Sequence, residues 1–278
     1  MSTVKSRTLQ GWRIVITRAA EQTQELRARL EELGAEVLLL PMIRFLEPED
    51  SSGLDRAIRS LADFEWLIFT SANAVSFFMA RCRALGISAK NGRTKIAAVG
   101  SATETALNRE GLLAVLVPVE FSGAALAKEF GAAIAGKTVL LPRSDRAGDD
   151  LPVALRRAGA EVTEVIAYRT AGPDALDQER VQAIRNGEVD AVTFFSPSAV
   201  REFHKLFGAD LPRICEAQVA FAAVGPVTAE AIRGAGLTVE VEADEARTAS
   251  VVAALESYFA ARGRKNGRSR MEASRSEA

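Results

Sequence analysis

Short apolar runs alternate with segments of helical periodicity along most of the chain. In the first half, runs of Val, Ile, Leu and Phe predict strands, and these cover residues 13–17, 36–41, 66–70, 96–99 and 113–117. Their apolarity is continuous, which is typical of parallel strands that are covered by helices on both faces of the sheet. Two of the intervening helices are predicted to end at glycines, Gly34 and Gly159. The pattern therefore predicts an α/β fold.

The whole pattern occurs twice, with a constant offset of 125 residues. RIVITR at 13–18 aligns with TVLLPR at 138–143, and the GAEV motif recurs at the same spacing. Ser71 then aligns with Ser196, and Gly100 aligns with Gly225. We interpret this as an internal duplication. Each copy predicts a flavodoxin-like, doubly wound parallel sheet of five strands.

The second strand of each copy is longer than a small domain requires. EVLLLPMIRFLE (36–47) and EVTEVIAYRTA (161–171) would each span more than about 30 Å. This favours a hypothesis in which both strands leave one domain and enter the other, pairing as a two-strand crossing linker. The expected boundaries are 1–41 plus 172–262 for domain 1, 46–166 for domain 2, and 42–45 and 167–171 for the linker. Two ordinary tandem domains are the alternative.

Hydroxyl, amide and small residues follow the predicted strands, just before the next helix. Ligands of open α/β sheets bind at the carboxyl ends of the strands, so these loops are the candidate site. Several helix N-termini there would suit a small molecule that carries many carboxylates. The alternative for each residue is an ordinary helix N-cap. The candidates are Ser71, Asn73, Gly100, Ser101, Thr103, Ser122, Ser196, Ser198, Gly225, Thr228 and Thr248.

Three further side chains carry possible chemistry. Arg18 and Arg143 occupy equivalent positions of the two copies and could form carboxylate forks, or they could be solvated surface arginines. Tyr168 lies in the second long strand. Its hydroxyl could donate a proton to a bound substrate, or the ring could simply be a packed aromatic residue.

Composition narrows the setting. The net charge is −1 and no apolar run approaches about 20 residues, so we expect neither nucleic-acid nor membrane binding. The segment MSTVKSRTLQGW is predicted to be a disordered lead without a signal core, and residues 263–278 are predicted to be a disordered tail. Cys82 and Cys215 are expected to be buried free thiols. Together these features predict a cytoplasmic protein, and we expect a monomer.

Several motifs that would indicate a cofactor are missing from the sequence. His204 is the only histidine and the two cysteines are far apart, which disfavours a zinc or haem site. GxGxxG after a strand, GxxxxGK[ST] and GxSxG do not occur. We therefore expect no metal and no cofactor.

Four segments carry a resemblance to a known family: TFFSPSAV (193–200), AFAAVGPVTAEAI (220–232), VIAYRT (165–170) and LIFTSANAV (67–75). Together they resemble uroporphyrinogen-III synthase, and the resemblance covers about residues 12–260. The first two segments are specific in combination, whereas either alone would be weak. The resemblance also implies two α/β domains that are joined by a two-strand ladder.

The resemblance implies a cofactor-free lyase of tetrapyrrole biosynthesis. Such an enzyme closes hydroxymethylbilane into uroporphyrinogen III, with loss of water and inversion of ring D. On this basis Tyr168 would be the acid, while Thr103, Thr228, Ser71 and Ser196 would face the substrate. Hydroxymethylbilane synthase would be a transient partner. The alternatives are a non-enzymatic binder of an anionic ligand and a synthase-like regulatory domain.

Overall fold

The computed structural model describes residues 7–90, 92–118, 123–245 and 247–263. The predicted tail at 264–278 and the candidate Ser122 lie outside these described residues.

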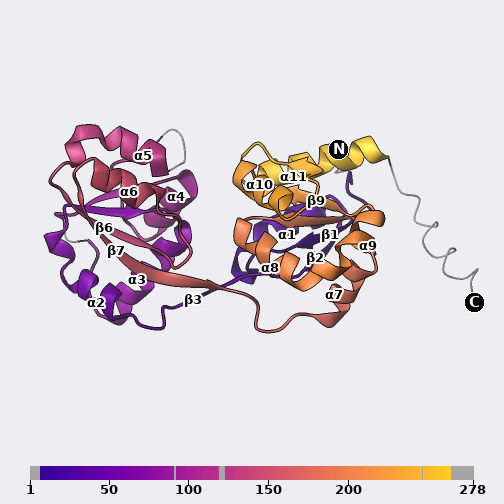
Figure 1. Cartoon of the computed structure of the whole chain (residues 1–278), viewed down its shortest axis with the longest axis horizontal. Helices are drawn as coiled ribbons and strands as arrows, with labels where there is room; N and C mark the ends of the chain where they lie inside the picture. Colours follow the sequence, from indigo (N-terminus) through magenta and orange to yellow (C-terminus); the bar gives the residue numbers. More distant parts are fainter. Residues whose placement is uncertain (1–6, 91, 119–122, 246, 264–278) are drawn as a thin grey trace, which may run out of the picture. The chain divides into compact units, whose positions relative to one another are not determined.

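The chain divides into two compact units (Figure 1). Unit 1 contains residues 1–44 and 172–278, and unit 2 contains residues 45–171. The chain therefore passes from one unit to the other twice, after Arg44 and after Ala171.

The sheet of unit 1 has five strands in the order β2-β1-β8-β9-β10, and all neighbours are parallel. All five are short, and the three central ones, β1, β8 and β9, are largely buried, as the continuous apolar runs predict. They are β1 (Arg13–Ile16), β2 (Glu36–Leu39), β8 (Ala191–Phe194), β9 (Ala220–Ala223) and β10 (Val241–Glu242).

The sheet of unit 2 has the order β3-β7-β6-β4-β5. The pairs β7–β6, β6–β4 and β4–β5 are parallel. The strands are β3 (Arg44–Leu46), β4 (Trp66–Phe69), β5 (Lys95–Ala98), β6 (Thr138–Ser144) and β7 (Glu161–Ala171). β3 and β7 are neighbours, and each lies where the chain passes between the units.

The duplication is visible strand by strand. β1 and β6 begin at equivalent positions of the two copies, as do β2 and β7, β4 and β8, and β5 and β9. Of these eight strands, each sheet contains two from each copy, and its fifth strand is β10 in unit 1 and β3 in unit 2. The shared order, β2-β1-β8-β9 in unit 1 and β7-β6-β4-β5 in unit 2, is the flavodoxin-like order predicted from the sequence.

Two predicted strands are shorter than expected. The run at 36–47 is interrupted between Leu39 and Arg44, a stretch that contains Pro41. The Leu40 and Met42 N–H groups still donate to the carbonyls of Ile16 and Thr17, so Pro41 lies on the open side of this edge strand, where a proline is tolerated. The strand predicted at 113–117 is reduced to one isolated bridge between Ala97 and Leu116. By contrast, β7 runs without a break over 11 residues.

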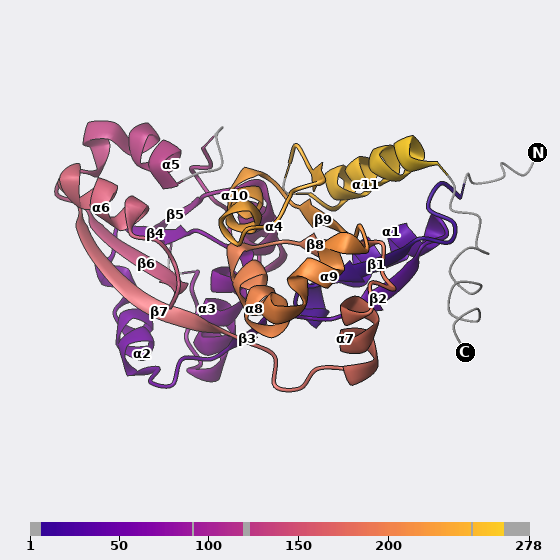
Figure 2. The ribbon, with the colours of Figure 1, turned by 45° about the vertical axis from the view of Figure 1, so that its right-hand side comes forward.

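Helices cover both faces of each sheet (Figures 1 and 2). In unit 2, Leu67 and Phe69 pack against helices α2, α3 and α4, whereas Ile68 between them faces α5 and α6. These helices are α2 (Ser52–Arg59), α3 (Ala72–Ala84), α4 (Ser101–Arg109), α5 (Gly123–Phe130) and α6 (Asp150–Arg157). Alternate strand residues therefore enter two separate cores, which is the doubly wound arrangement.

Unit 1 is built in the same way. One core lies between the sheet and helices α1 and α11, and on the other face Phe194 and Phe221 contact Phe203 of α8. The helices are α1 (Gln24–Glu32), α7 (Gln178–Arg185), α8 (Pro197–Phe207), α9 (Leu211–Glu216), α10 (Pro226–Gly234) and α11 (Thr248–Arg262). The predicted helix stops Gly34 and Gly159 have φ of +93° and +91°.

The prediction of a disordered lead is wrong for residues 7–12. Leu9 and Trp12 are buried, and the Trp12 ring stacks on Phe259 of α11 with a centroid distance of 4.3 Å. The Leu9 N–H also donates to the carbonyl of Leu33. These two large apolar side chains complete the core between α1 and α11, so the segment is ordered by burial. None of the helices in the described residues is long and apolar enough to cross a membrane.

Candidate functional site

Two equivalent serines follow β4 and β8, and both are helix N-caps. Ser71 Oγ accepts the Ala74 N–H at 3.1 Å, and Ser196 Oγ accepts the Ala199 N–H at 3.3 Å. Both side chains are half-buried. The capping alternative is therefore observed for both residues, at the carboxyl end of a strand where a ligand would also reach them.

The two glycine loops, VGSAT and VGPVT, form a second equivalent pair. Gly100 is the N-cap of α4 and Gly225 is the N-cap of α10. Gly225 has a φ of +119°, which L side chains rarely adopt. Thr103 and Thr228 are the third residues of these helices and are 4% and 5% exposed. The backbone N–H groups at the helix starts therefore offer more to a ligand than these two side chains do.

The other predicted loop candidates have contacts that do not indicate a ligand site. Ser101 and Thr248 are first helical residues and not N-caps, since Gly100 and Arg247 hold those positions. Ser198 Oγ accepts a hydrogen bond from Arg201 on its own helix at 2.9 Å. Asn73 is half-buried in the first turn of α3.

Tyr168 lies in β7 and is 7% exposed. Its ring stacks on Phe77 of α3 with centroids 5.5 Å apart, and the Phe45 ring meets it edge-on at 5.6 Å. Its hydroxyl lies 3.2 Å from Ser71 Oγ. Tyr168 is thus a packed aromatic residue, as one alternative held, and its hydroxyl also has a polar neighbour at the carboxyl end of β4.

The loop after β6 is fastened to the same part of β7. The Asp145 N–H donates to the Tyr168 carbonyl at 3.2 Å, and Asp145 Oδ1 accepts the Thr170 N–H at 2.9 Å. Ser144 Oγ lies 3.3 Å from Thr170 Oγ1. These bonds fix the backbone on both sides of the Tyr168 side chain.

Arg143 supports that loop from within unit 2. Its guanidinium donates to the carbonyls of Ala147 and Gly148 at 2.5 and 2.7 Å, and it forms ion pairs with Asp149 and Glu164. Only 6% of the Arg143 side chain is exposed. This placement favours a structural role for Arg143, in which it holds the loop. It disfavours the other role suggested by the sequence, a fork that binds a carboxylate of a ligand.

Arg18, the equivalent residue of unit 1, has different surroundings. Its guanidinium lies 5.0 Å from the centre of the Phe195 ring, and its Nε donates to Gln22 at 3.0 Å. The ion pairs observed among the described residues do not include Arg18. Burial lowers the pKa of Arg18, an effect that the charge of Glu25 partly offsets. Arg18 is therefore a desolvated cation beside the loop that starts α8.

Sequence reasoning missed Phe45, Phe77 and Asp145. Each lies far from Tyr168 in the chain and reaches it only through the order of strands in unit 2. Asp145 stands in the loop PRSDRAG, where the position after a strand was a usable signal. The two phenylalanines have no local pattern that separates them from ordinary core residues.

The cysteines and the histidine stay outside this group. Cys82 is buried, and burial raises its pKa to about 11, whereas Cys215 is exposed, which corrects the expectation of two buried thiols. His204 is exposed on α8. Within the described ranges, no cluster of three His, Cys, Asp or Glu side chains could hold a metal ion.

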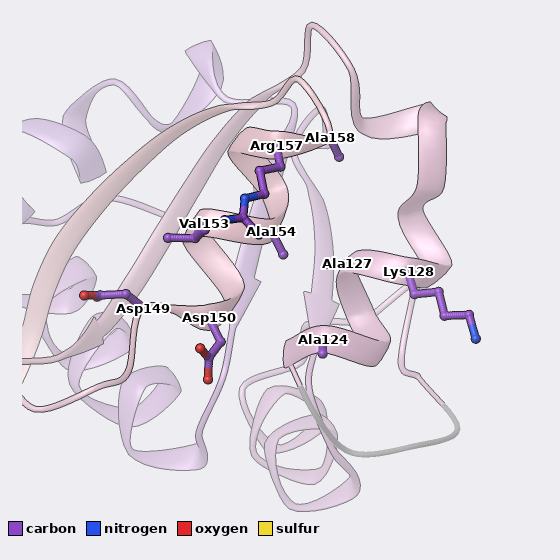
Figure 3. Close-up of a pocket in the computed structure, with 9 residues that line it drawn as sticks. All are labelled: Ala124, Ala127, Lys128, Asp149, Asp150, Val153, Ala154, Arg157 and Ala158. Carbon is purple, nitrogen blue, oxygen red and sulfur yellow. The ribbon is translucent and has the colours of Figure 1, made fainter.

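A surface pocket of about 630 Å³ lies in the groove between α5 and α6 (Figure 3). Ala127, Val153 and Ala154 line it, and Lys128 and Arg157 lie at its edge. None of the predicted site residues contributes to its lining. It is therefore separate from the groups around Tyr168.

Comparison with known proteins identifies the family. The model of the family described as uroporphyrinogen-III synthase HemD matches residues 24–253. The chain belongs to this family. The resemblance found in the four sequence segments is confirmed.

Curated members of the uroporphyrinogen-III synthase family match nearly the full length. The chain is 34% identical over 252 residues to a uroporphyrinogen-III synthase of Synechococcus elongatus, covering 89% of this chain and 96% of that protein. It is 30% identical over 230 residues to a putative uroporphyrinogen-III synthase of Methanothermobacter thermautotrophicus, covering 81% and 90%.

Solved structures of the family agree in fold. A mutant uroporphyrinogen III synthase from Thermus thermophilus matches with a TM-score of 0.65 at 24% identity, covering 90% of this chain and all of that one. The Helicobacter pylori enzyme matches with a TM-score of 0.59 at 16% identity, covering 88% and 99%. The two-domain α/β fold predicted from the sequence is thereby confirmed.

Proposed function

We propose that this protein is a lyase that cyclises hydroxymethylbilane to uroporphyrinogen III. The reaction loses water and inverts ring D, and it belongs to tetrapyrrole biosynthesis. The observation that carries the proposal is the family match over residues 24–253, together with relatives that are named as uroporphyrinogen-III synthases over most of their length. For the same reason, a non-enzymatic binder or a regulatory domain is not favoured.

The carboxylates of the substrate have suitable ligands at the carboxyl ends of the strands. In unit 1 we propose that Arg18 binds a carboxylate, assisted by the loops of Ser196, Ser198, Gly225 and Thr228. A guanidinium has the fork geometry that matches a bidentate carboxylate partner. In unit 2 the corresponding loops carry Asn73, Gly100 and Thr103. Each set offers groups that could bind a carboxylate of such a substrate.

We propose that Tyr168 is the acid of the first step. Its hydroxyl proton moves to the oxygen of the substrate's hydroxymethyl group, the C–O bond breaks, and the oxygen leaves as water. The lone pair of the pyrrole nitrogen forms a C=N bond and compensates the electrons lost from carbon. General acids of this kind contribute about 10²–10⁴-fold to a rate. The new cation must then meet the substituted carbon of ring D, which is a matter of positioning.

Three further expectations accompany this function. We infer a cytoplasmic location, a monomeric state and a transient contact with hydroxymethylbilane synthase. Free thiols at Cys82 and Cys215 support the cytoplasmic location, because cysteines persist unpaired in reducing compartments. The contact with hydroxymethylbilane synthase is supported by a chemical argument. Free hydroxymethylbilane closes spontaneously to the type I isomer, and direct transfer from one enzyme to the other would avoid this side reaction. No cofactor and no metal enters the proposed reaction.

The test is the product of the purified protein on freshly generated hydroxymethylbilane. We expect the type III isomer from the wild type, and a type III rate about 100-fold lower from Tyr168→Phe at similar KM. Type I product alone from the wild type would refute the proposed activity. A full rate in Tyr168→Phe would remove Tyr168 from the acid role and leave the activity standing.

A further inference from the structure

Among the hydrogen bonds observed for the described residues, the hydroxyl of Tyr168 has one side-chain partner, Ser71, and aromatic packing restricts its ring. Phe77 stacks on one side of the ring and Phe45 meets it edge-on. The Asp145 N–H holds the Tyr168 carbonyl at 3.2 Å. With the ring and the backbone fixed, the direction of the hydroxyl proton is the remaining freedom, and the atom that controls it is Ser71 Oγ at 3.2 Å.

The hydrogen bonds of Ser71 limit that direction. A serine hydroxyl has one proton to donate and two lone pairs. Ser71 Oγ already accepts the Ala74 N–H at 3.1 Å, as the N-cap of α3. Its own proton is free to be donated to the Tyr168 oxygen. In the opposite arrangement Tyr168 would donate to Ser71, and its proton would then be held away from a substrate.

We propose that Ser71 is a positioning residue that donates a hydrogen bond to the Tyr168 oxygen and so directs the tyrosine proton toward the substrate. This inference rests on the proposed function, in which Tyr168 is the acid. After proton transfer, the same bond and the N-terminus of the 13-residue helix α3 would stabilise the negative oxygen. The O–O distance of 3.2 Å exceeds the usual value of about 2.7–2.8 Å, and such bonds often tighten when substrate binds.

The duplication supports a role for Ser71 beyond capping. Ser196 caps α8 with the same bond to the third N–H of its helix. At the position equivalent to Tyr168, however, the first copy has Ile43. Capping therefore accounts for a serine in both units, whereas contact with a tyrosine hydroxyl is specific to Ser71.

A double-mutant cycle on kcat tests the inference. We expect Ser71→Ala to lower kcat for type III product about tenfold, with a smaller change in KM. In a Tyr168→Phe background the same substitution should lower kcat less than twofold, because the hydroxyl that it orients is gone. Ser71→Thr keeps the hydroxyl and should restore most of kcat. A merely structural role would not produce this coupling.

Controls separate positioning from helix capping. Ser71→Asp keeps an oxygen that can cap the helix, but its carboxylate cannot donate a hydrogen bond. We therefore expect Ser71→Asp to have a kcat as low as that of Ser71→Ala and a melting temperature near that of the wild type. Asp177→Ala removes the N-cap of α7, which accepts from Glu179 and Arg180, and should lower the melting temperature while leaving kcat unchanged. This control reproduces the loss of a helix N-cap that Ser71→Ala causes, but on a helix of unit 1.

Three results would overturn the inference. One is an equal loss of kcat from Ser71→Ala in both backgrounds, and another is wild-type kcat in Ser71→Asp. The third is a full rate in Tyr168→Phe, which would leave Ser71 with no acid to orient. If the wild type makes type I product only, the proposed function itself fails, and the inference fails with it. The first two results leave the proposed function intact.

Discussion

The duplication has placed two arginines at equivalent positions, and their surroundings differ. Arg143 follows β6 and is enclosed by Glu164, Asp149 and two loop carbonyls. Arg18 follows β1, lies against Phe195 and donates to the side chain of Gln22. The Arg143 guanidinium forms ion pairs, whereas the ion pairs observed among the described residues do not include Arg18.

A single residue of the neighbouring strand accounts for much of this difference. Leu141 pairs with Glu164 between β6 and β7, and Ile16 pairs with Leu39 between β1 and β2. Leu39 therefore occupies the position at which Glu164 neutralises Arg143. The same fold position therefore carries an arginine in both copies, and the carboxylate beside it in unit 2 gives that arginine an ion-pair partner.

The largest effect is expected from Arg143→Met. The substitution leaves Glu164 without its buried partner and two loop carbonyls without a donor, so we expect a loss of about 3 kcal/mol in unfolding free energy. Denaturant unfolding measures it. Arg156→Met is the matched control, because Arg156 pairs with the same carboxylate but its side chain is 47% exposed, and a loss below about 1 kcal/mol is expected. Equal losses in the two variants would contradict the distinct role of Arg143.

Arg18→Met should act on substrate binding and not on folding. Loss of a charge-assisted bond to a carboxylate is worth about 1.5–3 kcal/mol, so we expect KM to rise about 10- to 100-fold. Removing a partly buried cation whose desolvation the charge of Glu25 only partly offsets should leave the melting temperature unchanged or higher. Arg27→Met removes an exposed arginine that pairs with Glu31 on α1, and KM should stay as in the wild type. An unchanged KM in Arg18→Met would exclude Arg18 as a ligand.

Leu39→Glu tests whether the carboxylate on the neighbouring strand causes the difference between Arg18 and Arg143. It introduces into unit 1 the carboxylate that unit 2 has at Glu164, so Arg18 should gain an internal partner and KM should rise several-fold. Leu39→Gln has a similar shape without the charge and should raise KM less. Steady-state kinetics of both variants provide the measurement. The same KM in the two variants would show that charge at this position does not govern Arg18.

The smallest effect belongs to an ordinary surface pair of unit 2, Asp55 and Arg81. Hydrogen bonds from Arg81 lower the pKa of Asp55 below its usual value. A carboxyl with a lowered folded-state pKa stabilises the fold above its unfolded pKa of about 3.9. That contribution is lost as the pH falls through the folded pKa. In Asp55→Asn the unfolding free energy should therefore fall slightly less as the pH is lowered below about 4. Denaturant unfolding at several pH values measures this, and the same pH dependence as the wild type would contradict the pairing.

Much of the fold could be predicted because the signals are local or repeated. Continuous apolar runs indicate the buried parallel strands, and the repeated landmarks give the strand order of both sheets. The ordering of Leu9 and Trp12 could not be predicted, because it depends on α11 more than 200 residues away.

Some residues of the candidate site could likewise be predicted from the sequence, and others required the structure. The serines, the glycine loops and Tyr168 could be found from their place after strands and from the family resemblance. The difference between Arg18 and Arg143 could not, because it depends on which residue of a neighbouring strand lies beside each guanidinium. The contacts of Phe45 and Phe77 with Tyr168 likewise require the three-dimensional order of strands and helices.

The most direct test of the account is the fraction of type III isomer in the uroporphyrinogen formed at increasing protein concentration. Hydroxymethylbilane is supplied at a fixed amount, and the isomers are separated after oxidation. The account predicts that the type III fraction rises with protein until it accounts for nearly all product. A product that remains type I at every concentration would contradict the proposed function.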